Sequence, residues 1–201
     1  MKALSASWGI AILAGGEGRR IGGKKPERYD MGIRLIDRAL SRAEAWGAPM
    51  ALCLKNPEQI ADLPPSLTVL LDPPGEAGPT GGLVSALSWA RGLGLNGILI
   101  MPCDMPDLHE GLWAHLLAEA VRDGSEDAVC FMPIDEMGFC PVLSLWRASA
   151  LEGVIAALAV GRTALKHLIA DLDGRHVRVP EGWLGRNVNA PEDLRPAIAV
   201  S

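Results

Sequence analysis

The segment Leu13–Pro26, LAGGEGRRIGGKKP, combines glycine and positive charge directly after an apolar run. It holds five glycines, two arginines and two lysines in a chain whose overall charge is negative. Glycine lets the backbone approach a phosphate closely and point amides at it, and arginine and lysine neutralise phosphate oxygens. A flexible basic loop is the plain alternative, but the position at the end of an expected strand favours a phosphate-binding loop.

Two standard phosphate-binding patterns come close to this segment without matching it. The dinucleotide fingerprint needs GxGxxG, whereas Gly16 and Gly18 are followed by Gly22, one position too late. The P-loop needs GxxxxGK followed by Ser or Thr; the spacing from Gly18 to Lys24 fits, but Lys25 replaces the hydroxyl residue that would meet magnesium. The segment therefore indicates phosphate binding without belonging to either motif.

Two aspartates follow later apolar runs of the chain. Asp72 comes directly after Leu70–Leu71 and before a loop rich in glycine and proline, and Asp104 lies in the segment MPCDMP. Either aspartate could belong to an ordinary turn, and Asp104 taken alone could also cap the N-terminus of the next segment. Beside a phosphate-binding loop, however, a carboxylate oxygen is the kind of ligand that Mg²⁺ prefers. The combination predicts metal-assisted nucleotide chemistry.

Short apolar runs that alternate with helical patterns must position these residues. The expected strands are Gly9–Leu13, Pro49–Leu54, Leu67–Leu71, Gly97–Met101, Ala128–Met132, Pro141–Trp146 and Arg175–Val179. The expected helices are Leu35–Trp46, Gly82–Leu93, Leu112–Val121, Ala148–Val160, Thr163–Leu172 and Pro191–Leu194. Buried runs separated by helices predict a doubly wound α/β protein with a mostly parallel sheet, whose ligands bind beyond the carboxyl ends of the strands.

Composition excludes several other classes of protein. The chain has 201 residues and a net charge of −5, which makes it a poor general binder of nucleic acid. No apolar stretch reaches the roughly 18 residues of a membrane span. The four cysteines show no CxxC spacing, so neither a disulfide framework nor a zinc site is expected. These features predict a reduced, cytoplasmic protein without a linker between separate domains.

Four motifs, taken in chain order, resemble those of the MobA family of molybdenum cofactor guanylyltransferases. They are LAGGxGRRxGGxK, GPTGG, PCDMP and NVNAPEDL, the last at Asn187–Leu194. Many sugar-nucleotide and cytidylyl transferases share the opening loop, whereas the last motif is more specific. In related cytidylyltransferases an aspartate tends to replace one of its asparagines. The resemblance implies a single Rossmann-like, three-layer α/β/α domain over residues 1–201.

The resemblance also implies the reaction and its participants. The enzyme would transfer GMP from GTP to the phosphate of molybdopterin with Mg²⁺ as cofactor and would release pyrophosphate. Its protein partners would include enzymes that make molybdopterin and apoenzymes that receive the finished molybdenum cofactor.

By the same resemblance, the catalytic residues are Lys25, Asp104 and Arg20, and Asp104 also binds the metal ion. The nucleotide-binding residues are Leu13, Ala14, Gly15, Gly16, Arg19, Lys25, Asp72, Gly78, Gly82 and Asp104. The acceptor-binding residues are Asn187 and Asn189. Because the attacking phosphate is already ionised near neutral pH, no general base is needed. None of the histidines is therefore expected to be catalytic, namely His109, His115, His167 and His176.

The chain departs from the family pattern at positions that bear on its substrates. Lys24 stands where the family usually has Asp, and Cys140 stands where it usually has His. An asparagine expected after the second strand reads Leu54, with Asn56 two residues later. The departures leave open a related transferase that uses CTP or another acceptor, such as a molybdopterin cytidylyltransferase or a sugar-phosphate nucleotidyltransferase. A non-catalytic nucleotide-binding partner is the third alternative.

Overall fold

The computed structural model describes residues 7–16, 18–73, 78–123, 128–136 and 138–197. Their main sheet consists of β1 (Trp8–Leu13), β4 (Met50–Leu54), β5 (Thr68–Leu71), β6 (Gly97–Pro102), β7 (Cys130–Asp135), β8 (Gly138–Phe139), β9 (Ser144–Arg147) and β10 (Arg175–Arg178). The strands lie in the order β10-β7-β9-β6-β1-β4-β5, with β8 beside β7. Pairs of β1 with β4 and β6, of β4 with β5 and of β7 with β10 are parallel, whereas β9 is antiparallel to its neighbours. The predicted mostly parallel sheet is confirmed.

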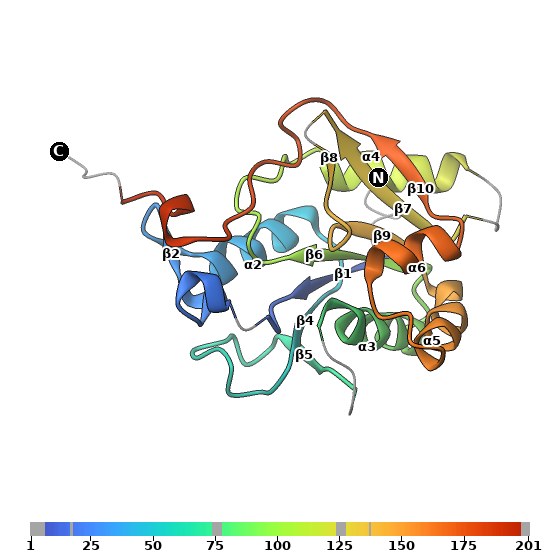
Figure 1. The fold of residues 1–201 in the computed structure, drawn as a ribbon, viewed down its shortest axis with the longest axis horizontal. Coiled ribbons are helices and arrows are strands. Elements are labelled where there is room, and N and C mark those ends of the chain that lie inside the picture. The colour runs from blue at the N-terminus through green and yellow to red at the C-terminus, as the bar shows by residue number, and fades with distance from the viewer. Residues whose placement is uncertain (1–6, 17, 74–77, 124–127, 137, 198–201) are drawn as a thin grey trace.

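Helices cover both faces of this sheet (Figure 1). They are α2 (Leu35–Trp46), α3 (Pro79–Gly92), α4 (Leu112–Arg122), α5 (Leu151–Ala159) and α6 (Leu165–Asp171), with 3-10 turns η1 (Arg19–Ile21), η2 (Lys25–Glu27), η3 (Ala148–Ala150) and η4 (Pro191–Asp193). Ile10 and Ile12 of β1 belong to the same core cluster as α2 and α4, whereas Ala11 belongs to the cluster of α3, α5 and α6. Because successive strand residues face opposite sides, this split confirms the three-layer α/β/α arrangement. Full burial of each isoleucine contributes about 1.5–3 kcal/mol.

Most expected elements are present. Where their observed bounds differ from the expected ones, the cause is local. Helix α3 begins at Pro79, three positions before the expected start, because proline is well tolerated in the first turn of a helix. Strand β9 begins at Ser144 and not at Pro141, because the amide of Leu143 bonds back to the carbonyl of Cys140 in a turn. The helix expected from Ala148 is a 3-10 turn followed by α5.

A small hairpin between the glycine loop and α2 was not expected. It pairs β2 (Tyr29–Asp30) with β3 (Ile33–Arg34) through a two-residue turn at Met31 and Gly32. Both turn residues have positive φ, 52° and 78°, as the primed turns of tight hairpins require. Two-residue strands carry no periodicity, so hydrophobic patterning could not reveal them.

The parallel strands bring their carboxyl ends to one edge of the sheet. The glycine loop follows β1, Lys55 follows β4, Asp72 follows β5, and Asp104 comes shortly after β6. The edge expected to bind ligands therefore gathers residues from four different parts of the chain. Within the described part of the chain, no helix has the length and apolar character needed to cross a membrane.

Candidate functional site

A pocket of about 190 Å³ opens at the carboxyl ends of β1, β5 and β6. The predicted nucleotide-binding residues that line it are Leu13, Gly15, Gly16, Asp72, Gly78, Gly82 and Asp104. Ala14 is buried behind this wall, where its amide bonds to the carbonyl of Cys53 and its carbonyl accepts from Gln59 Nε2. Arg19 and Arg20 lie in η1; Arg20 is exposed, and the side chain of Arg19 lies outside the described part of the structure.

Gly15 and Gly82 have no side chain that could fill the space beside Asp72. A Cβ atom at Gly82 would lie 2.7 Å from Leu13 Cδ2, and one at Gly15 would lie 3.3 Å from the backbone nitrogen of Lys55. Both positions are also within 4 Å of the Asp72 carboxylate. Burial raises the pKa of Asp72, an effect that the positive charge of Lys55 partly offsets. A side chain at either glycine would therefore crowd the region in which this carboxylate lies.

The glycine loop has a conformation that its glycines make possible. Gly18, Gly22 and Gly23 all have positive φ, and Lys24 adopts the left-handed region as well. The loop closes on itself because the carbonyl of Gly18 accepts the amide of Gly23 at 2.9 Å. Arg28, which the sequence did not single out, donates to the carbonyls of Gly22 and Gly23 at 2.8 and 3.2 Å. These two hydrogen bonds from Arg28 stabilise the conformation of the loop.

Lys25, Asp104 and Asn189 form one contact group at the edge of the pocket. Lys25 Nζ pairs with Asp104 Oδ2 and donates to Asn189 Oδ1 at 3.1 Å. The side chains of Lys25 and Asp104 are only 15% and 17% exposed. The structure thus brings together three residues that the family resemblance assigns to catalysis, metal binding and acceptor binding, although Lys25 and Asn189 are 164 positions apart.

The segment of residues 187–189, called the acceptor segment below because the family resemblance assigns its asparagines to acceptor binding, is attached to Asp104 through its backbone. The amide of Val188 donates to the carbonyl of Asp104 at 2.9 Å, and the Val188 side chain is fully buried between two exposed asparagines, Asn187 and Asn189. Asp193 accepts the amides of Asn189 and Ala190 at 2.7 and 2.9 Å, and these backbone bonds lower its pKa. The backbone that carries the two asparagines is therefore fixed by hydrogen bonds to Asp104 on one side and to Asp193 on the other.

One oxygen of Asp104 is suited to a cation. Asp104 Oδ1 is buried and has no hydrogen-bond partner in the described structure. Among the same residues, no three His, Cys, Asp or Glu side chains group together as a complete metal site. Mg²⁺ commonly binds through one or two carboxylates and completes its shell with water and substrate phosphates. Asp104 therefore fits a single-carboxylate magnesium site that also needs the substrate.

The histidines are engaged in contacts outside the pocket lining. His109 Nδ1 accepts the amide of Gly111 at 3.0 Å, and His115 Nε2 lies 3.0 Å from the carbonyl oxygen of Arg178. Trp183 stacks on His109 with the ring centroids 4.3 Å apart and meets His115 edge-on. This tryptophan packs against the core and the two histidines.

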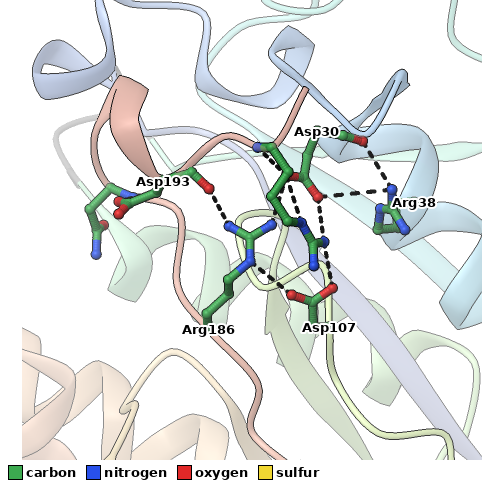
Figure 2. Close-up of polar contacts among 7 residues, drawn as sticks. Asp30, Arg38, Asp107, Arg186 and Asp193 are labelled. Carbon is green, nitrogen blue, oxygen red and sulfur yellow. Dashed lines mark hydrogen bonds and ion pairs between the residues drawn. The ribbon is translucent and has the colours of Figure 1, made fainter. Parts of the chain in front are cut away.

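Sequence reasoning also missed a cluster of ion pairs next to the acceptor segment (Figure 2). Asp30 of the hairpin is fully buried and binds Arg186 and Arg195, and Asp107 pairs with the same two arginines. Burial alone would raise the pKa of Asp30, but hydrogen bonds from Arg195 and Arg186 hold it well below its usual range. Only the charge types were visible in the sequence, since no local spacing connects residue 30 with residues 186 and 195.

An α/β fold with a glycine loop and a pocket beyond its parallel strands is typical of nucleotide-binding proteins, and the relatives of this chain make it a nucleotidyltransferase. The chain belongs to the MobA-like NTP transferase family, whose domain model matches residues 10–178. Molybdenum cofactor guanylyltransferase from Rhodobacter capsulatus is 32% identical over 194 residues, which cover 92% of each chain. A probable molybdenum cofactor guanylyltransferase from Opitutus terrae is 29% identical over 199 residues and 96% of each chain. The resemblance found in the motifs is therefore confirmed.

Solved structures show the same fold. Molybdopterin-guanine dinucleotide biosynthesis protein A from Archaeoglobus fulgidus has a TM-score of 0.75 at 22% identity and covers 92% of this chain and 94% of its own. The 2-C-methyl-D-erythritol 4-phosphate cytidylyltransferase from Thermus thermophilus has a TM-score of 0.65 at 17% identity, with 91% and 93% covered. The fold is thus shared with a cytidylyltransferase and does not by itself select the nucleotide.

Proposed function

We propose that the protein transfers GMP from GTP to the phosphate of molybdopterin, releases pyrophosphate and so forms molybdopterin guanine dinucleotide. The observation that carries this proposal is the contact of Lys25 with both Asp104 and Asn189 at the pocket edge. It joins the residues predicted for phosphate, metal and acceptor binding in one place. The names of relatives that align over more than nine-tenths of the chain support the same reaction.

Nucleotide binding would use the backbone more than side chains. Gly15 and Gly16 line the pocket with little bulk, and α3 begins at Pro79 in the same wall. Exposed amides of a glycine loop and the positive end of a helix both favour phosphate oxygens. The triphosphate of GTP would therefore lie between the loop and α3, with Asp72 beside the nucleoside.

The reaction needs charge neutralisation and alignment. A phosphate oxygen of molybdopterin attacks the α-phosphorus of GTP, a new P–O bond forms, and the bond to the β-phosphate oxygen breaks as pyrophosphate leaves. Lys25 and Arg20 would offset the negative charge of the two reacting phosphates, and Asn187 and Asn189 would orient the acceptor. When bound at Asp104, Mg²⁺ would supply further charge stabilisation at the α-phosphate and the leaving group.

We also propose which proteins supply the acceptor and receive the product, and in which compartment the reaction takes place. The acceptor must come from enzymes that make molybdopterin, and the product must pass to apoenzymes that use the guanine dinucleotide form. We place these transfers in the cytoplasm.

A thermal-shift panel with GTP, CTP, ATP and UTP, each with and without Mg²⁺, tests the nucleotide part of the proposal. A ligand at one hundred times its Kd stabilises a protein by about 2.7 kcal/mol, or roughly 5–11 °C for a domain of this size. We expect a magnesium-dependent shift with GTP that exceeds the other three. A larger shift with CTP would favour a cytidylyltransferase instead, and the absence of any shift would contradict nucleotide binding by the free protein.

A further inference from the structure

Arg186 is held on three sides by groups from different parts of the chain (Figure 2). Its Nη2 lies 2.7 Å from Asp30 Oδ1, and its Nε lies 2.9 Å from Asp107 Oδ2. Its Nη1 donates to the main-chain carbonyl of Asp193. The contacts of Nη1 and Nη2 are hydrogen bonds, whereas that of Nε is an ion pair without hydrogen-bond geometry. A planar guanidinium can reach three separate groups in this way, whereas a lysine ammonium has a single point of charge.

Arg186 and its partner Asp107 lie close in sequence to residues that we propose for acceptor and metal binding. Asp107 follows Asp104 by three positions, and Arg186 immediately precedes Asn187. The two segments are also in close backbone contact: a Cβ atom at Gly185 would lie 2.7 Å from the carbonyl oxygen of Asp107. Together with the bond from Val188 to Asp104, these contacts align residues 185–188 along residues 104–107.

The positive charge of Arg186 is neutralised by ion pairs within the protein. Asp30 and Asp107 both pair with it, and its side chain is only 30% exposed. A guanidinium occupied by two carboxylates contributes little free positive charge for a substrate phosphate. Its effect on the site must therefore come from where it holds the neighbouring backbone.

We propose that Arg186 is a positioning residue that holds Asn187 and Asn189 against Asp104 for recognition of the acceptor phosphate. This inference rests on the proposed function, because it takes the two asparagines as the acceptor-binding residues. The same placement sets the partner of Lys25, whose Nζ donates to Asn189. Arg186 does not line the pocket wall formed by Gly15, Gly16 and Asp72, so we expect nucleotide binding to depend on it less than acceptor binding does.

Arg195 provides a matched control within the same cluster. Its Nη2 lies 2.6 Å from Asp30 Oδ2 and 2.8 Å from Asp107 Oδ1, so it pairs with the same two carboxylates as Arg186. It lies beyond η4 and is not adjacent to either acceptor asparagine. Replacing either arginine leaves Asp30 with the other one and with Arg38, whose Nη2 lies 3.9 Å from Asp30 Oδ2. Each variant thus removes one of three arginine contacts, and the two variants should lose similar stability.

The first test compares the steady-state kinetics and Tm of Arg186→Met and Arg195→Met with those of the wild type. We expect Arg186→Met to raise KM for molybdopterin by about tenfold or more, while KM for GTP changes less than about twofold. Arg195→Met should lower Tm to a similar extent and leave both KM values within about twofold. An unchanged KM for molybdopterin in Arg186→Met, or equal increases in both variants, would overturn the proposal.

A second test needs no substrate and so separates this inference from the proposed function. Hydrogen exchange of the Val188 amide, which bonds to Asp104, should accelerate about tenfold or more in Arg186→Met and stay near the wild-type rate in Arg195→Met. Arg186→Lys, which keeps one charge, should fall in between and decides the matter if Arg186→Met does not fold. Equal exchange in the Arg186 variants and the wild type would contradict positioning. A wild-type protein that fails to transfer GMP would contradict only the proposed function and the acceptor role.

Discussion

The two carboxylate oxygens of Asp104 have different environments. Oδ2 pairs with Lys25, whereas buried Oδ1 has no hydrogen-bond partner in the described structure. A buried oxygen without a partner costs free energy, which a bound cation would recover. The side chain is therefore arranged for a ligand that the protein alone does not supply.

Replacing Asp104 with Asn tests this role directly. The change keeps the size of the side chain but removes its charge, so we expect kcat/KM for magnesium-dependent transfer to fall by about a hundredfold or more. Thermal shifts with nucleotide should also lose their dependence on Mg²⁺. Asp173→Asn, at an exposed position, serves as the control and should match the wild type. An Asp104→Asn variant with full magnesium-dependent activity would remove this residue from the metal site.

Lys24 and Lys25 are adjacent and differ sharply in environment. Lys25 is 15% exposed and lies against Asp104, whereas Lys24 is 80% exposed and has Glu27 as a partner at 3.5 Å. We expect Lys25→Ala to lower kcat/KM for transfer by about a hundredfold, because it removes the charge that we propose lies beside the reacting phosphates. Lys24→Ala should lower it by less than about threefold. Equal losses in the two variants would mean that the total charge of the loop matters more than the position of Lys25.

At the level of the elements, the glycine loop determines where Lys25 lies. Gly18 has a φ of 59°, and a Cβ atom there would lie 2.6 Å from Lys25 Cβ. Gly23 also has a positive φ, but a Cβ atom there would meet open space. Both glycines allow the left-handed backbone, and only Gly18 also makes room for the lysine.

Alanine substitutions separate the two effects. Gly23→Ala should cost about 1–2 kcal/mol in the free energy of unfolding, from backbone strain alone. Gly18→Ala should cost more and should also lower kcat/KM for transfer about tenfold or more relative to Gly23→Ala, because Lys25 must move. Urea unfolding and steady-state kinetics measure the two quantities. Equal activity in the two variants would show that Lys25 tolerates displacement.

The sequence predicted best the regular strands, of which β1, β4 and β6 are buried and β5, at the edge of the sheet, is mostly exposed. The strands β1, β4, β5 and β6 are short apolar runs, and their observed ends differ from the expected ones by at most one residue. The rule that ligands bind beyond parallel strands then led to Asp72 and Asp104, which both line the pocket. The strand bounds and the position of the two aspartates at one edge of the sheet could be predicted because each depends on a local pattern.

Contacts between distant segments could not be predicted in this way. Arg186 and Asp30 are 156 positions apart, and charged residues in loops usually remain in solvent. The hairpin that carries Asp30 is too short to show a pattern of alternation. Only the three-dimensional structure reveals that a buried carboxylate needs those arginines.

At the scale of the whole molecule, Asp30 connects the N-terminal hairpin with the C-terminal segment. Because hydrogen bonds from arginine hold its folded-state pKa far below its usual value of 3.8, its ionised form stabilises the folded state. This contribution is fully present above the unfolded-state pKa and is lost as the pH falls below about 4. The cluster should therefore make the protein sensitive to acid.

Urea unfolding of the wild type and Asp30→Asn at pH 7 and at pH 3 tests this link. At pH 7 the variant should be less stable by about 1.5–3 kcal/mol, because Arg186 and Arg195 lose the charged hydrogen bonds to the buried carboxylate and keep only Asp107 as an acidic partner. The difference should shrink at pH 3, because Asp30 of the wild type is largely protonated in the unfolded state at that pH but stays ionised in the folded state. Asp173→Asn should show little difference at either pH. A gap between wild type and Asp30→Asn that does not depend on pH would contradict the linkage.

The most direct measurement is the identity of the nucleotide that is transferred. The protein is incubated with molybdopterin, Mg²⁺ and equal concentrations of GTP and CTP, and the products are identified by mass spectrometry while pyrophosphate is quantified. We predict molybdopterin guanine dinucleotide with one pyrophosphate released per product. Formation of the cytosine dinucleotide, or consumption of GTP without any pterin product, would contradict a guanylyltransferase.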